Sequence, residues 1–96
     1  MGGGALQRTH RHAQVLGYNT GVRFTASAAK HGATEEAITH VIDHAVVGIR
    51  LSAERILFLG PDAGGRVLEV IAAEVDDGLL VFHAMPISAK YRRYLP

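Results

Sequence analysis

Cysteine is absent from this sequence, and so is any long apolar run. Without cysteine, disulfides, thiolate-ligated zinc sites and cysteine nucleophiles are excluded. No apolar run reaches the roughly 18–20 residues that cross a membrane. No apolar core of a signal peptide follows Arg8 and Arg11, so we expect a cytoplasmic protein. A chain of 96 residues, 48% of them hydrophobic, predicts one domain with a modest core.

Acidic residues are missing from both ends of the chain. All nine lie between Glu35 and Asp77, whereas residues 1–34 and 79–96 carry only basic charges, and the net charge of +1 conceals this division. If the two ends meet in space, they form a basic surface suited to phosphate or to an acidic partner. The alternative is an ordinary surface of mixed charge.

The first 21 residues, "MGGGALQRTHRHAQVLGYNTG", follow neither a strand nor a helix period. They predict an N-terminal tail, with a single domain over residues 22–96. His10 and His12 lie in this tail, and His40 and His44 have the i, i+4 spacing of a metal-binding pair. No third ligand is evident beside either pair, so we predict no metal and expect His40 and His44 to face solvent.

The rest of the chain predicts an α+β fold. Thr34 can cap a helix that carries Glu35 and Glu36 in its first turn, and Ser88 can cap a short final helix. Because the last three strands are strong and joined by short turns, we predict an antiparallel meander sheet of three to four strands. The N-terminal helix packs on it and a short C-terminal helix follows. The hydrophobic patterns predict strands at 22–26, 46–51, 54–60, 66–75 and 79–85.

The turn lengths predict which side chains share a face of the sheet. A three-residue "DDG" loop pairs Val75 with Leu79 and sets Ile71 opposite His83. A five-residue "PDAGG" loop pairs Gly60 with Arg66 and sets Leu57 opposite Glu69. Glu69 and His83 are then diagonal neighbours, and a slip of one residue would destroy the arrangement. The predicted face carries Arg55, Leu57, Leu59, Val67, Glu69, Ile71, Val81, His83 and Met85.

An arginine, a glutamate and a histidine on one apolar face have three interpretations. They can form a catalytic set, with Glu69 orienting the titratable His83 and Arg55 holding a phosphate. They can form a buried ion pair that satisfies itself. His83 can also be a lone core histidine. The residues alone favour the structural interpretations.

The last segment, "ISAKYRRYLP", combines apolar and basic residues. We expect an apolar stripe that docks on the sheet, formed by Ile87, Tyr91, Tyr94 and Leu95. The outer side is either a solvated basic face or a phosphate clamp beside a tyrosine that stacks on a base. Its basic residues are Lys90, Arg92 and Arg93.

The order of motifs resembles the BrnT-like toxins, which belong to the RelE/ParE-like superfamily of type II toxin–antitoxin systems. The resemblance spans residues 30–95 and rests on "KHG" before a capped helix, Arg55 opening a strand, "GR" at Gly65 and Arg66, and the terminal "RRY". The family commonly has "SAR" in its last strand. Here His83 takes the place of the serine and Met85 that of the arginine, so the family's catalytic arrangement is not carried over whole.

The resemblance implies cleavage of RNA without metal or cofactor, in which the RNA's own 2′-hydroxyl attacks the adjacent phosphate. It also implies a cognate antitoxin, usually a small dimeric DNA-binding protein. The alternative is a non-catalytic module of the same fold that binds an antitoxin or nucleic acid. On the catalytic interpretation His83 is the acid–base group, Arg55 and Lys90 are cations, Tyr91 stacks or donates a proton, and RNA is bound by Arg66, Arg92, Arg93 and Lys30.

Overall fold

The computed structural model describes residues 21–96. The predicted tail, with His10 and His12, lies outside these residues except for Gly21, whose carbonyl accepts a hydrogen bond from the Leu79 amide at 3.2 Å. No helix within this range is long and apolar enough to cross a membrane. The elements in chain order are β1 (Val22–Phe24), the 3₁₀ helix η1 (Ala26–Ala29), α2 (Glu35–Asp43), β2 (Val47–Arg50), β3 (Arg55–Pro61), β4 (Val67–Val75), β5 (Gly78–Pro86) and α3 (Ala89–Arg92).

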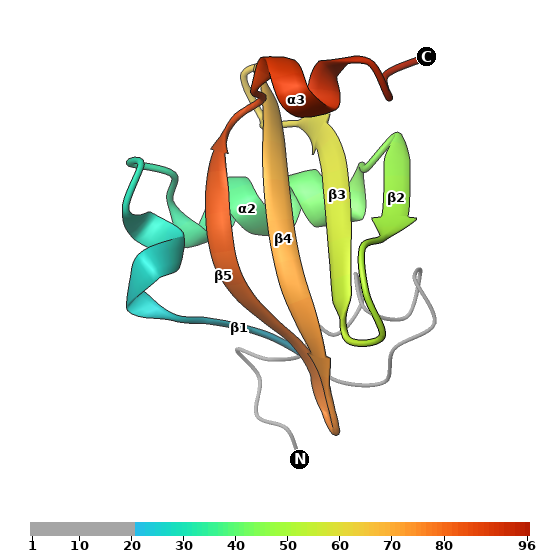
Figure 1. The fold of residues 1–96 in the computed structure, drawn as a ribbon. Helices are drawn as coiled ribbons and strands as arrows, with labels where there is room; N and C mark the ends of the chain where they lie inside the picture. The colour runs from blue at the N-terminus through green and yellow to red at the C-terminus, as the bar shows by residue number, and fades with distance from the viewer. Residues whose placement is uncertain (1–20) are drawn as a thin grey trace.

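The predicted α+β class is confirmed, but the sheet differs from the prediction. It has five strands in the order β1-β5-β4-β3-β2, and β1 runs parallel to β5 while the other neighbours are antiparallel. The sheet is therefore mixed, not an antiparallel meander of three to four strands (Figure 1). Short turns specify only neighbouring partners along the chain. The pairing of β1 with β5 joins segments that are far apart in the sequence, so no turn predicts it.

Helix α2 covers one face of the sheet and lies behind it in Figure 1. The hydroxyl of Thr34 accepts a hydrogen bond from the Ala37 amide at 3.1 Å, which confirms the predicted cap. At the far end of the helix, the chain passes very close to Gly60 in β3, where a Cβ atom would lie 2.9 Å from the Cα of Ala45. The core on this side includes Ile38, Val41, Ile42, Ile56, Phe58, Leu68, Val70, Ala72, Leu79, Val81 and Ala84.

Helix α3 lies across one end of the opposite face (Figure 1). Ile87 and Tyr91 join Leu57 and Leu59 in a second core, with Leu95 packed against it. Tyr94 was predicted to dock with them, but it is 43% exposed. The helix spans only four residues, and Ser88 occupies its N-cap position without a side-chain capping bond. The segment is too short for Tyr94 to return to the buried side.

The register between β3 and β4 differs from the prediction by two residues. Pro61 pairs with Val67, and Leu57 lies opposite Ile71 instead of Glu69. The loop still has five residues, but it begins after Pro61, because β3 continues through that residue. Because side chains alternate with a period of two, a slip of two residues leaves every side chain on its predicted face.

The register between β4 and β5 contains a bulge that the sequence did not reveal. The turn has two residues, and Val75 pairs with Gly78 instead of Leu79. Gly78 has a φ of 139°, which favours glycine in so tight a connection. The bulge at Phe82 then restores the predicted pairing of Ile71 with His83. Between the turn and the bulge the faces are reversed, so Val81 belongs to the core on the α2 side.

Candidate functional site

Glu69 is a buried carboxylate on the α3 side of β4. It is 3% exposed, yet both of its oxygens have partners. Its Oε1 accepts the backbone N–H of Ser88 at 2.7 Å, and its Oε2 lies 2.8 Å from Nε2 of His83. A carboxylate is tolerated among apolar side chains when its oxygens are satisfied in this way. Glu69 therefore joins β4, β5 and the start of α3.

The environment of Glu69 favours its ionised form. Burial opposes ionisation, but hydrogen bonds from Ser88 and His83 and the charge of the imidazole outweigh it and lower the pKa of Glu69. An ionised carboxylate only accepts hydrogen bonds, so Nε2 of His83 carries the proton. In the neutral imidazole the lone pair is then on Nδ1. This atom has no hydrogen-bond partner within residues 21–96, and 28% of the His83 side chain is exposed.

His31 lies beside this pair, although the sequence marked it only as part of the "KHG" motif. The ring centroids of His31 and His83 are 6.1 Å apart and the rings are inclined by 74°. His31 is exposed in the turn between η1 and α2, where Gly32 reverses the chain with a φ of 88°. The juxtaposition depends on the parallel pairing of β1 with β5, which the sequence pattern does not report.

Arg55 shares the predicted face but lies apart from the glutamate and the histidine. It pairs with Ala73, so four residues of β4, roughly 13 Å of strand, separate its position from that of Glu69. Its guanidinium carbon lies 4.7 Å from the ring centroid of Phe82. No hydrogen bond or ion pair links Arg55 to Glu69 or His83 in the described part of the chain. The predicted trio is thus a hydrogen-bonded pair and a separate cation.

The other predicted residues of the C-terminal segment surround α3. Tyr91 is 9% exposed and packs in the core beneath the helix, so its ring does not present a face to solvent. The ammonium of Lys90 lies 5.1 Å from the centroid of that ring. The guanidinium groups of Arg92 and Arg93 donate to the Ile87 carbonyl and the Tyr94 hydroxyl, each at 3.3 Å. Both arginines are exposed.

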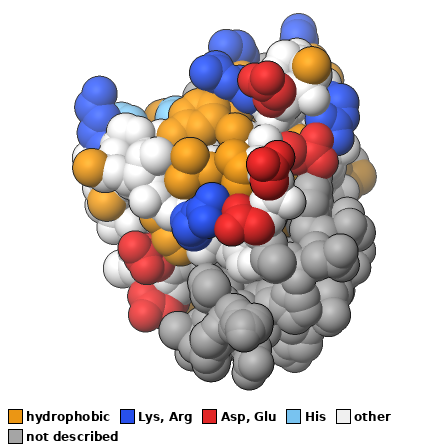
Figure 2. All heavy atoms as spheres, turned by 90° about the horizontal axis from the view of Figure 1, so that it is seen from below, with side chains coloured by type: hydrophobic (Ala, Val, Ile, Leu, Met, Phe, Trp, Pro, Cys, Tyr) orange, Lys and Arg blue, Asp and Glu red, His pale blue; other side chains and the backbone are white. Residues whose placement is uncertain are grey.

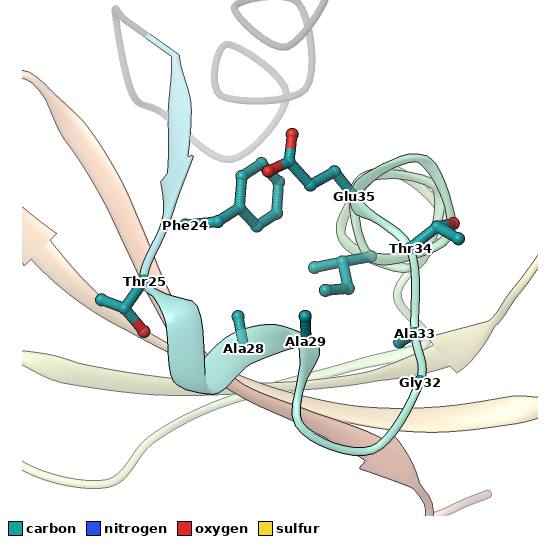
Figure 3. A pocket seen from close by; sticks show the side chains of 9 residues that line it. Phe24, Thr25, Ala28, Ala29, Gly32, Ala33, Thr34 and Glu35 are labelled. Carbon is teal, nitrogen blue, oxygen red and sulfur yellow. The ribbon is translucent and has the colours of Figure 1, made fainter.

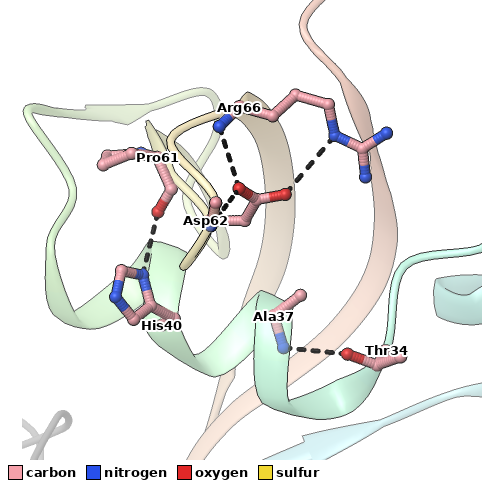
Figure 4. A network of polar contacts seen from close by, with 7 residues as sticks. Thr34, Ala37, His40, Pro61, Asp62 and Arg66 are labelled. Carbon is pink, nitrogen blue, oxygen red and sulfur yellow. Dashed lines mark hydrogen bonds and ion pairs between the residues drawn. The ribbon is translucent and has the colours of Figure 1, made fainter.

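Arg66 belongs to the turn between β3 and β4. The Oδ1 atom of Asp62 accepts the amides of Gly64 and Arg66 at 2.9 Å, and its Oδ2 lies 3.4 Å from Nε of Arg66 (Figure 4). The backbone hydrogen bond from Arg66 is the main cause of the lowered pKa of Asp62; burial opposes it, and the Gly64 amide and the Arg66 charge add to it. Arg66 thus helps to hold the turn.

His40, in α2, and His44, at its C-cap, each contact a backbone carbonyl through a ring nitrogen. Nδ1 of His40 lies 3.0 Å from the Pro61 carbonyl, and Nδ1 of His44 lies 3.0 Å from the His40 carbonyl (Figure 4 shows the first). The two rings stack, with centroids 4.1 Å apart and planes inclined by 20°. His44 is exposed as predicted, but His40 is half-buried. Residues 21–96 contain no group of three histidine or acidic side chains that could hold a metal.

A separate hollow of about 300 Å³ lies between β1, η1 and the start of α2 (Figure 3). Small and apolar side chains line it, among them Phe24, Ala28 and Ile38, with Glu35 at its edge. Seen from below, the described surface carries basic and acidic side chains around an apolar patch (Figure 2). On that side the charge is mixed. Arg23 and Asp77 form an exposed ion pair, with Arg23 Nη1 and Asp77 Oδ2 2.9 Å apart.

Comparisons of the chain with protein-family models, with curated proteins and with solved structures find no match.

Proposed function

We propose that this chain is a ribonuclease toxin that cleaves RNA without a metal ion, with His83 as its acid–base group. The observation that carries the proposal is the hydrogen bond between Glu69 and His83. A buried carboxylate fixes the imidazole's orientation and tautomer, which is how acid–base histidines are commonly prepared. The partly exposed ring leaves Nδ1 for a substrate.

The chemistry also requires positive charge, because the transition state gathers negative charge on the phosphate oxygens. Lys30 adjoins His31 in the sequence. Lys90 lies two residues after Ser88, whose backbone amide donates a hydrogen bond to Glu69. Neither ammonium group has an acidic partner among residues 21–96. Lysines without an acidic partner are suited to contacts with phosphate.

Phe82 gives the same face an aromatic surface. It is half-exposed and directly precedes His83, and the guanidinium of Arg55 lies over its ring. Unpaired RNA bases stack on aromatic rings and on arginine planes. An RNA strand that runs from Phe82 toward α3 would pass His83. Arg55 then contributes more to binding the RNA than to stabilising the reacting phosphate.

The alternative is a non-catalytic module that pairs with an antitoxin or with nucleic acid. It is favoured by Met85, which stands where the resembling toxins have an arginine, and by the contacts that occupy Arg66, Arg92 and Arg93 within the chain. The proposed toxin acts in the cytoplasm and is itself bound by a cognate antitoxin. A small DNA-binding reading frame beside the gene would support both versions.

The deciding experiment measures RNA cleavage by the purified chain, freed from any antitoxin, with and without ribosomes and in the presence of a chelator. We expect cleavage that the chelator does not affect, and a loss of roughly 10²-fold or more in His83→Gln. His44→Gln is the matched control, because His44 is exposed and lies on the other side of the sheet. If the wild-type chain cuts no RNA in any of these conditions, the enzyme is rejected and the binding module remains.

A further inference from the structure

Attack of a 2′-hydroxyl on the neighbouring phosphate requires two proton transfers. A base takes the proton of the 2′-hydroxyl, and an acid gives a proton to the departing 5′-oxygen. His83 provides only one of these functions in a single step. The second titratable ring at this place is that of His31, whose centroid lies 6.1 Å from that of His83.

We propose that His31 is the general acid and His83 the general base of an RNA-cleaving pair. This inference rests on the proposed function and adds a second catalytic residue to it. Neither nitrogen of His31 has a hydrogen-bond partner within the described range, and no hydrogen bond joins the two rings. Each ring therefore keeps a nitrogen for the substrate. Catalysis requires the 2′-oxygen to lie within about 2.6–3.2 Å of one ring nitrogen and the 5′-oxygen within the same distance of the other.

The roles follow from the partners of the two rings. Glu69 keeps the proton on Nε2 of His83, so Nδ1 offers a lone pair and accepts the proton of the 2′-hydroxyl. Within residues 21–96 no acidic side chain forms a hydrogen bond or ion pair with His31, which is exposed and can take up a proton from water between turnovers. Proton exchange with water also returns His83 to its neutral form.

The step balances without any further reactant. The 2′-oxygen forms a bond to phosphorus while its proton moves to Nδ1 of His83. The bond between phosphorus and the 5′-oxygen breaks, and the electron pair of that bond stays on the oxygen. The oxygen then takes the proton of His31. The products are a 2′,3′-cyclic phosphate and a 5′-hydroxyl.

Contacts with β5 fix the position of His31. The hydroxyl of Ser27 donates to the Phe82 carbonyl at 2.7 Å, and the Thr25 amide donates to the Val81 carbonyl at 2.9 Å. These bonds fix η1 against the strand that carries His83. The amide of Gly32 closes the following turn on the Ala29 carbonyl at 3.0 Å. His31 lies within that turn.

The test compares wild type, His31→Gln, His83→Gln and the control His44→Gln on two oligonucleotides. One carries the site that wild type cleaves. In the other, sulfur replaces the bridging 5′-oxygen at that site. A thiol ionises near pH 8.5, so the sulfur departs without an acid. On the oxygen substrate we expect both site variants to lose roughly 10²-fold or more. On the sulfur substrate His31→Gln should recover to near the wild-type rate, while His83→Gln stays slow.

Each outcome decides one point. If wild type cuts neither substrate, the proposed function fails, and the pair with it. If wild type cuts and His31→Gln cuts the oxygen substrate equally well, the proposed function stands and His31 is not catalytic. If sulfur fails to restore His31→Gln, or restores His83→Gln instead, the assignment of acid and base is overturned. Thermal melts of the variants confirm that the comparison is made on folded protein.

Discussion

The hydroxyl group of Ser27 donates a hydrogen bond of 2.7 Å to the carbonyl oxygen of Phe82. Phe82 is the bulged residue of β5, because the ladder to β4 passes from Val81 to His83 without it. A bulge leaves the extra residue unpaired and bends its strand. Ser27 supplies the missing donor and ties η1 to the strand beside His83.

Replacing Ser27 by alanine should therefore weaken the attachment of η1. We expect Ser27→Ala to lower the free energy of unfolding by about 0.5–1.5 kcal/mol, the usual value of one hydrogen bond. Urea unfolding followed by circular dichroism measures the change. Ser27→Thr keeps the hydroxyl and is the control. Equal stability of Ser27→Ala and wild type would show that water replaces Ser27 without cost.

Gly60 tests how tightly α2 packs on the sheet. A Cβ atom there would lie 2.9 Å from the Cα of Ala45 and 3.1 Å from the Val41 carbonyl, and neither is the end of a flexible side chain. Gly60→Ala should cost about 1–3 kcal/mol, the scale of overpacking in a core. Gly48→Ala is the matched control, because nothing lies within 4 Å of a Cβ at that strand position. Equal stabilities of the two variants would contradict the close approach.

Glu69 makes the stability of the domain depend on pH. Its pKa is lowered in the folded chain, so near the unfolded value of about 4.3 the unfolded chain binds more protons than the folded one. The stabilisation is complete above that value and is lost as the pH falls through the lower folded pKa. We expect Glu69→Gln to be about 1–3 kcal/mol less stable than wild type at pH 6. The gap should close toward pH 3.

Urea unfolding of both proteins across this range measures the effect. Glu36→Gln is the control, because Glu36 is exposed in the first turn of α2. A gap between wild type and Glu69→Gln that stays constant from pH 6 to pH 3 would mean that the loss comes from packing and not from the charge of Glu69.

The sequence predicted the positions of the strands and helices better than the contacts between them. Alternating apolar residues and the Thr34 cap identified the five strands and α2 within a few residues, because local patterns determine them, but the 3₁₀ helix η1 was missed. The contact of Glu69 with His83 followed from alternation, although the predicted turn between β4 and β5 was wrong. The bulge at Phe82 compensates for a shorter turn at Gly78.

The missed features depend on distant pairing. His31 reaches His83 only because β1 lies parallel to β5, and no local pattern encodes that neighbour. The burial of Tyr91 and the exposure of Tyr94 depend on α3 ending after one turn. A residue type at a plausible spacing thus identified candidates, while the packing decided which of them face solvent.

Tyr91 provides the last test, because it separates packing from chemistry in the predicted site. Its ring is 9% exposed in the core beneath α3, and its hydroxyl has no hydrogen-bond partner among residues 21–96. Tyr91→Ala should lower the free energy of unfolding by about 3 kcal/mol or more, as for other buried aromatic residues. Tyr94 is 43% exposed, so Tyr94→Ala should stay within about 0.5 kcal/mol of wild type. Tyr91→Phe keeps the packing, so it should match wild type in both stability and RNA cleavage. If Tyr91→Phe is stable but cleaves roughly 10²-fold more slowly, the hydroxyl takes part in proton transfer, and α3 must then move to expose it.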